Sequence, residues 1–198
     1  MRKSRAALLS LAMSLALPAA LAAQQPAGPP PGGPITGVFR GRTMALQRNL
    51  ALAFDSIPES KFSYKPTPAQ LSVGYIAQHL ANDNYFFCNE FGAQKATRPA
   101  NDTATPDSVK ATWPKATLVA SLKESFTFCE QAFAQLDDAK LADNITMTFG
   151  GQSRQAPRAQ MVLGHVVDMA DHYSQIANYM RLNNMIPPTA LPRPGTRN

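Results

Sequence analysis

The stretch from Leu163 to Pro188, LGHVVDMADHYSQIANYMRLNNMIPP, constrains the fold most, because it sets polar groups into the apolar side of one long helix. At helical spacing, His165, Asp168 and His172 lie on the same side as Ile176. Burying an imidazole or a carboxylate costs free energy unless the group is hydrogen-bonded, paired or bound to a ligand. The stretch therefore predicts a core helix whose polar residues either satisfy one another or form a site.

Apolar residues recur at helical spacing in four segments, which predicts an all-α fold with helices over residues 38–56, 67–91, 115–136 and 158–184. Thr67 and Pro68 suit the N-cap and the first position of the second helix. Long polar links, residues 92–114 and 137–157, follow the second and third helices. Links of this length favour crossovers over tight hairpins, so we expect a four-helix bundle with long crossover connections.

The two links contain further local patterns. Residues 145–149 alternate as a short strand would, and Gly150 and Gly151 follow them as a turn. Because no partner strand is evident, this segment is expected to be extended loop. The first link is expected to contain a short helical turn over residues 107–111.

The N-terminus has the pattern of a secretory signal peptide over residues 1–23. Three basic residues precede an apolar run over residues 6–17, and Ala20-Leu21-Ala22 forms a small-x-small cleavage site. A transmembrane anchor is the alternative, because residues 6–23 approach the minimum length of a span. We expect cleavage, and hence a periplasmic or secreted protein without a stable membrane anchor.

The mature chain is expected to comprise three parts. Residues 24–37 form a Pro/Gly-rich tether, residues 38–190 the helical domain, and residues 191–198 a disordered tail. Removal of the signal peptide lowers the formal net charge from +6 to +3. This charge is modest and the basic residues are scattered, so we expect no nucleic-acid partner.

The chain has two cysteines, Cys88 and Cys129. An even number of cysteines in an exported protein favours a disulfide, and two buried free thiols are the alternative. Closing a loop of about 40 residues would contribute roughly 3–4 kcal/mol in the chain-entropy model.

The spacing of the histidines favours one metal-ligand set over another. Asp168 and His172 are four residues apart on one helix, so their side chains can share an ion, and His79 lies on a second core helix. His165 and His172 are seven apart, about 10.5 Å along the axis, which is too far to share an ion without distortion. We therefore prefer His79, Asp168 and His172 as ligands of a divalent metal (Zn, Ni, Fe or Mn). The alternative is a set of structural core residues.

Two segments resemble the DinB-like proteins: residues 71–88, which contain IAQHLANDNYFFC, and residues 162–188, which contain HYSQIANYMRLNNMIPP. The resemblance spans roughly residues 39–188. It implies a four-helix bundle of up-down-down-up topology with a divalent metal held by three histidines, one on the second helix and two at i, i+4 on the last. Some members are thiol-dependent transferases or isomerases, and many have no known activity.

Residue by residue, the resemblance assigns the second-helix ligand to His79 and the later ligand of the i, i+4 pair to His172. The earlier ligand of that pair falls on Asp168, where the family usually has histidine. A site of two histidines and one aspartate is chemically reasonable for Zn or Ni. His165, one turn earlier, is the alternative third ligand.

These observations predict an exported, divalent-metal-dependent enzyme of the DinB-like type, a hydrolase or a thiol or group transferase acting on a small molecule. Asp83 and His165 are candidates for proton transfer. The alternative is a catalytically silent binding or dimerisation module that has lost the metal site and whose polar core residues bond one another. A homodimer is compatible with either function.

Overall fold

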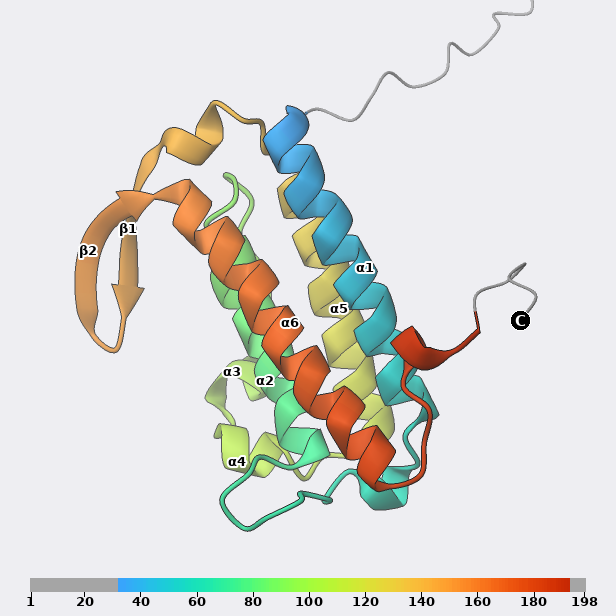
Figure 1. Ribbon diagram of the computed structural model, residues 1–198. Helices are drawn as coiled ribbons and strands as arrows, with labels where there is room; N and C mark the ends of the chain where they lie inside the picture. The colour runs from blue at the N-terminus through green and yellow to red at the C-terminus, as the bar shows by residue number, and fades with distance from the viewer. Residues whose placement is uncertain (1–31, 193–198) are drawn as a thin grey trace, which may run out of the picture. The chain divides into compact units, whose positions relative to one another are not determined.

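The computed structural model describes residues 32–192, and its elements are α1 (Pro34–Ser56), α2 (Val73–Cys88), α3 (Ala100–Ala104), α4 (Asp107–Lys110), α5 (Lys115–Phe133), β1 (Asn144–Phe149), β2 (Gln152–Pro157) and α6 (Arg158–Leu182) (Figure 1). The fold is mostly helical, with one small sheet. The predicted signal peptide, most of the tether and residues 193–198 lie outside the described residues.

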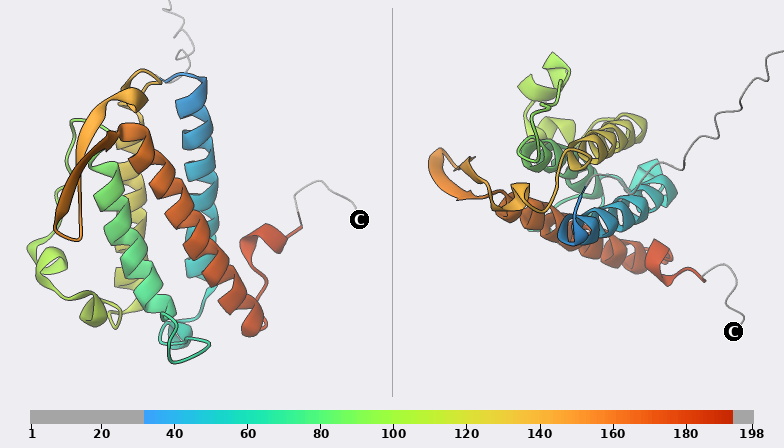
Figure 2. Two further views of the ribbon diagram at one scale, coloured as in Figure 1. Left: turned by 60° about the vertical axis from the view of Figure 1, so that its left-hand side comes forward. Right: turned by 90° about the horizontal axis from the view of Figure 1, so that it is seen from above.

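The four long helices pack against one another in pairs. Helix α2 contacts α5 and α6, and α1 contacts the same two helices from the other side (Figures 1 and 2). Their shared apolar core includes side chains with no solvent exposure, such as Phe54, Ile76, Leu80 and Leu122. Helices α2, α5 and α6 end two or three residues before the predicted positions. Within residues 32–192, none of the helices has both the length and the apolar character needed to cross a membrane.

Helix α1 begins at Pro34, inside the segment predicted to be tether. Proline suits the first helical position because its fixed φ is already helical and it has no N–H to satisfy. The Asp138 carboxylate caps the helix from far along the chain, accepting hydrogen bonds from the backbone N–H of Ile35 (3.1 Å) and of Thr36 (2.8 Å). These hydrogen bonds, with that from the Thr36 hydroxyl, lower the pKa of Asp138. The helix start therefore depends on a tertiary contact.

Helix α2 begins at Val73, and the prediction that Thr67 caps it is wrong. Ser72 is the N-cap, and its hydroxyl accepts a hydrogen bond from the N–H of Tyr75 at 3.2 Å. The Thr67 side chain instead bonds Gln70 within the preceding turn. The N–H of Val73 bonds the Tyr64 carbonyl in the loop, so the backbone before Ser72 cannot be helical.

The segment predicted to be extended loop is a β-hairpin. Strand β1 pairs antiparallel with β2, from Asn144 opposite Pro157 to Phe149 opposite Gln152. Gly150 and Gly151 form the turn with φ of +57° and +78°, the left-handed conformation that such hairpin turns require. The partner strand was missed because β2 has only one buried side chain and hence no alternating apolar pattern.

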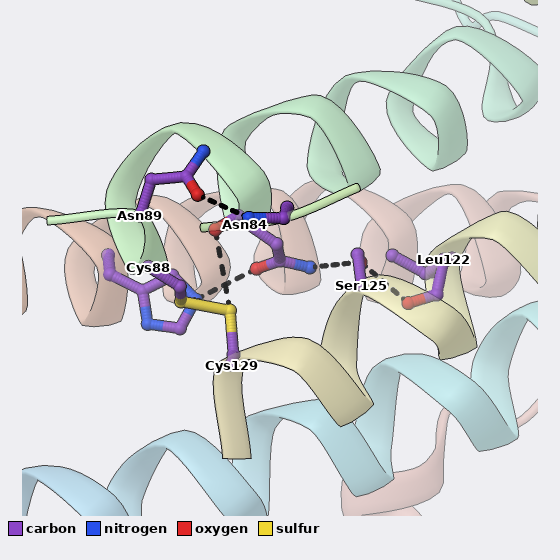
Figure 3. The surroundings of a disulfide bond; sticks show 8 residues. Asn84, Cys88, Asn89, Leu122, Ser125 and Cys129 are labelled. Atoms are coloured by element: carbon purple, nitrogen blue, oxygen red, sulfur yellow. Dashed lines mark hydrogen bonds between the residues drawn. A yellow bond between two sulfur atoms is a disulfide. The ribbon is translucent and has the colours of Figure 1, made fainter. Parts of the chain in front are cut away.

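The expected disulfide forms between Cys88 and Cys129 and links the end of α2 to α5 (Figure 3). The two Cα atoms are 5.3 Å apart, and neither residue is exposed. Its sequence separation of 41 makes it a long-range restraint on the unfolded chain.

Replacing both cysteines with alanine is expected to lower the free energy of unfolding by roughly 3–4 kcal/mol, because the unfolded chain regains the entropy of the open loop. Urea unfolding of the oxidised protein and of the Cys88→Ala/Cys129→Ala variant measures this difference. Adding a reductant should remove most of it. An unchanged difference under reducing conditions would mean that side-chain packing, and not the cross-link, stabilises the fold.

Candidate metal centre

Helices α2 and α6 face each other through polar side chains that recur every four residues on each helix. The rings of His79 and His172 lie edge to face, with centroids 4.9 Å apart. One turn further along both helices, the carboxyl groups of Asp83 and Asp168 lie close enough to affect each other electrostatically. Going from the histidine pair to the carboxyl pair runs forward along α2 and backward along α6, so the two helices pack antiparallel here. We call this line of contact the α2/α6 seam.

The seam brings together the three predicted ligands. His79, Asp168 and His172 each offer one donor atom, and these atoms lie within 4.8 Å of one another. The Nε2 atom of His172 is 3.5 Å from Oδ1 of Asp168. The exposed fraction falls from 30% for the His79 side chain to 19% for Asp168 and 8% for His172. The cluster is therefore open to solvent on the α2 side and closed on the α6 side.

Burial and the neighbouring carboxylate affect the two imidazoles differently. Burial and the proximity of His172 lower the pKa of His79. Burial also disfavours the charged form of His172, but the hydrogen bond to Asp168 and the charge of that carboxylate outweigh it, so the pKa of His172 is raised. At neutral pH His79 is therefore the better electron-pair donor, and His172 is held by its aspartate.

Asp83 lies beside the cluster as a second carboxyl group. Its Oδ2 is 3.2 Å from Nε2 of His79. Burial, with the nearby charge of Asp168, raises the pKa of Asp83 to about 7. A carboxyl group in this place can fix the tautomer and the ring orientation of the histidine it contacts.

The cluster has polar atoms that the protein itself does not satisfy. Nδ1 of His172 and Oδ2 of Asp168 are buried and make no hydrogen bond within the described residues. Leaving such groups unpaired costs about 1–3 kcal/mol each. Two imidazoles and a carboxylate are donors that Zn²⁺, Ni²⁺, Fe²⁺ and Mn²⁺ all accept. The residues therefore fit a divalent cation.

Comparison with known proteins now places the chain in a family. The model of the DinB superfamily matches residues 42–181, which is most of the chain and spans both helices of the seam. The chain belongs to the DinB superfamily. A search of curated proteins found no match.

Solved structures, one of them a DinB-like protein, share the fold. A DinB-like protein from Bacillus cereus is 16% identical, with a TM-score of 0.59, and the match covers 76% of this chain and 93% of that protein. A conserved protein from Enterococcus faecalis is 15% identical, with a TM-score of 0.55 and coverage of 75% and 96%. The mycothiol-dependent maleylpyruvate isomerase is 10% identical, with a TM-score of 0.57, and the match covers 71% of this chain and 60% of the isomerase.

In this DinB-superfamily chain, the third histidine, His165, lies apart from the cluster of His79, Asp168 and His172. His165 is fully buried against the disulfide, with Nε2 at 3.7 Å from the sulfur of Cys88 and 3.6 Å from that of Cys129. The same Nε2 is 2.8 Å from Oδ1 of Asn84. His165 is thus separated from the open side of the seam, and its expected role in proton transfer has no support in its position.

A chain of hydrogen bonds fixes the tautomer of His165. The Ser125 hydroxyl donates to the Leu122 carbonyl, so it accepts from the Asn84 amide nitrogen (Figure 3). The amide oxygen of Asn84 then faces His165 and must accept, which places the imidazole proton on Nε2. Nδ1 is buried and has no hydrogen-bond partner in the part of the chain that the structure describes. Burial lowers the pKa of His165 to about 4, so it is neutral in the folded protein.

One neighbour of the cluster could have been found from spacing and was not. Tyr75 lies four residues before His79 on α2, and the two rings are 6.0 Å apart. An i, i+4 relation on a helix predicts such a contact. Asn84 and Ser125, by contrast, come from different helices, so no local pattern in the sequence relates them.

The buried His165 predicts a loss of stability in mild acid. Its folded pKa of about 4 lies below the unfolded value of 6.5, so its contribution is complete above pH 6.5 and is lost as the pH falls towards 4. The loss is roughly 3 kcal/mol at 1.36 kcal/mol per pKa unit. Urea unfolding at a series of pH values should show a smaller loss for His165→Gln, whose amide can still donate to Asn84. Parallel curves for the two proteins would contradict the assignment.

Proposed function

We propose that this DinB-superfamily protein is a divalent-metal-dependent enzyme acting on a small-molecule substrate, with His79, Asp168 and His172 as its metal ligands. The observation that carries the proposal is the convergence of three donor atoms within 4.8 Å, with unpartnered atoms on two of the three residues. The proposal takes the four long helices as a bundle of up-down-down-up topology, in which α2 and α6 supply the ligands.

The protein's own residues have distinct parts in this proposal. When bound, the cation would supply Lewis acidity and lower the pKa of a coordinated water or thiol. Asp83, 3.2 Å from Nε2 of His79, holds that imidazole in orientation. Asp168 does the same for His172 while offering its second oxygen as a ligand. The 30% exposure of His79 leaves the α2 side as the approach for a substrate.

Two reaction classes are consistent with such a site, hydrolysis and transfer to a thiol. The similarity of fold to a mycothiol-dependent isomerase supports the thiol class. The buried disulfide and the signal-like N-terminus favour an oxidising compartment, where small thiols tend to be oxidised. We therefore propose hydrolysis, or transfer of a group to an acceptor other than a free thiol.

Metal analysis of protein purified without a His tag tests the site directly. After equilibration with Zn²⁺, Ni²⁺, Fe²⁺ or Mn²⁺ and dialysis, elemental analysis is expected to show about one ion per chain. His79→Ala, Asp168→Ala and His172→Ala should each weaken binding more than about 100-fold, because losing a residue that only orients a ligand already costs 10–100-fold.

The matched controls are Asp171→Asn, which alters an exposed carboxylate beside His172, and His165→Gln. Both should keep the metal, and loading should raise the melting temperature of the wild type, since a ligand that binds the folded state stabilises it. If the wild-type protein cannot be loaded with a divalent metal, the proposal is wrong and the alternative, a catalytically silent module, is favoured. Metal retained in Asp168→Ala and lost in His165→Gln would show that His165 is the third ligand.

We also propose that the protein is exported and that its signal peptide is cleaved near Ala23. The proposal is supported by the basic and apolar pattern of residues 1–23 and by the disulfide. Expression of the full chain in a Gram-negative host, followed by intact-mass analysis of the periplasmic fraction, should give a mature N-terminus at Ala23 or Gln24. An uncleaved chain recovered with the membranes would contradict cleavage.

A further inference from the structure

The α2/α6 seam continues beyond the carboxyl pair into an apolar region. Four residues past Asp83 on α2 is Phe87, and four residues before Asp168 on α6 is Gly164. A Cβ placed on Gly164 would come within 2.9 Å of Cε1 of Phe87, so the ring lies directly against this glycine. The step from the carboxyl pair to this contact is about 6 Å along each helix axis.

The β-hairpin, which leads directly into α6 (Figures 1 and 2), contacts α2 near this region through Phe149 and Phe86. A cavity of ≈410 Å³ lies between α2 and the hairpin, lined by Phe86, Phe87, Met147, Phe149, Gln152 and Arg154. The Phe86 ring is 5.2 Å from Phe87 and 6.3 Å from Phe149, both edge to face. Aromatic side chains from two separate elements thus face one space.

The cavity wall is aromatic, yet much of it is exposed. Phe149 has 78% of its surface exposed and Phe86 has 37%. Exposing large apolar side chains is unfavourable in water, so a ligand that covers them gains free energy. Arg154 is the one charged residue among those that line the cavity. An occupant that has an apolar ring and a negative charge would match both features.

We propose that this cavity binds the aromatic ring of an anionic small-molecule substrate, whose carboxylate pairs with Arg154 and whose reacting group reaches the metal cluster. The proposal rests on the metal-dependent function proposed above and identifies its substrate class. The cavity volume falls within the range of small-molecule sites. Phe87, which lines the cavity, follows Asp83 by about one helical turn on α2, so the cavity neighbours the carboxyl pair along this helix.

The experiment uses 3-phenylpropionate as the probe, with neutral 3-phenylpropan-1-ol and non-aromatic butyrate as comparison probes. Ligand-observed NMR titration of the mature protein gives the dissociation constants. Contacts between the ring protons of the probe and the Met147 methyl group, assigned with Met147→Leu, place the probe in the cavity. The expected order of affinity is the aromatic acid, then the aromatic alcohol, then butyrate.

Phe149→Ala should weaken 3-phenylpropionate binding about five- to tenfold, because it removes an aromatic ring that the probe is expected to contact. Phe149 is exposed, so its loss should leave the helical core intact. Arg154→Gln should weaken the acid by a similar factor and leave the alcohol unchanged. The matched controls, Leu182→Ala and Arg181→Gln, change exposed residues at the far end of α6 and should change neither.

The test separates this proposal from the metal site. His172→Ala should lose metal and bind the probe with unchanged affinity, and Phe149→Ala should keep metal and bind the probe more weakly. Equal affinities for the three probes, or no contact with Met147, would overturn the proposal even if metal binds. A wild-type dimer that becomes monomeric on Phe149→Ala and binds no probe would also overturn it, because a second copy would then cover the cavity.

Discussion

The antiparallel contact between α2 and α6 is the constraint on which the rest of the site depends. Side chains four residues apart on each helix meet in successive pairs, His79 with His172 and Asp83 with Asp168. Because both helices advance one turn between pairs, shifting either helix by one turn would break both contacts together. The candidate ligands His79, Asp168 and His172 and the second carboxyl group, Asp83, therefore have fixed relative positions along the seam.

The register of α2 in this contact is set from its other side. The Cys88–Cys129 disulfide and the hydrogen bond from Asn84 to Ser125 (2.8 Å) attach the end of α2 to α5. His165 then joins α6 to the same point through Asn84. A polar group buried this deeply is costly unless it is bonded, and Nδ1 of His165 has no partner among residues 32–192. His165 thus joins α6 to α2 at this point, while His79 and His172 contact each other at the seam.

Much of this arrangement was predictable where the information was local. Apolar periodicity predicted the long helices. Asp168 lies four residues from His172 and His165 lies seven, so helix spacing favoured Asp168, and the structure brings it together with His172 and the third candidate, His79. What could not be predicted depends on contacts between distant segments. Asp138 caps α1 from across the chain, and that contact moves the helix start to Pro34. Strand β2, which is polar and mostly exposed, becomes a strand only because β1 pairs with it.

The aspartate at position 168 has a consequence that a histidine there would not. Its carboxylate raises the pKa of His172 through a hydrogen bond, and its charge also raises the pKa of Asp83 across the seam. One anionic side chain is therefore shared by an imidazole on its own helix and a carboxyl group on the facing helix. A cation at this position would neutralise that charge and relieve the repulsion between the two carboxyl groups. The residue that falls where the resemblance places a histidine thus adds negative charge to the seam, which both His172 and Asp83 experience.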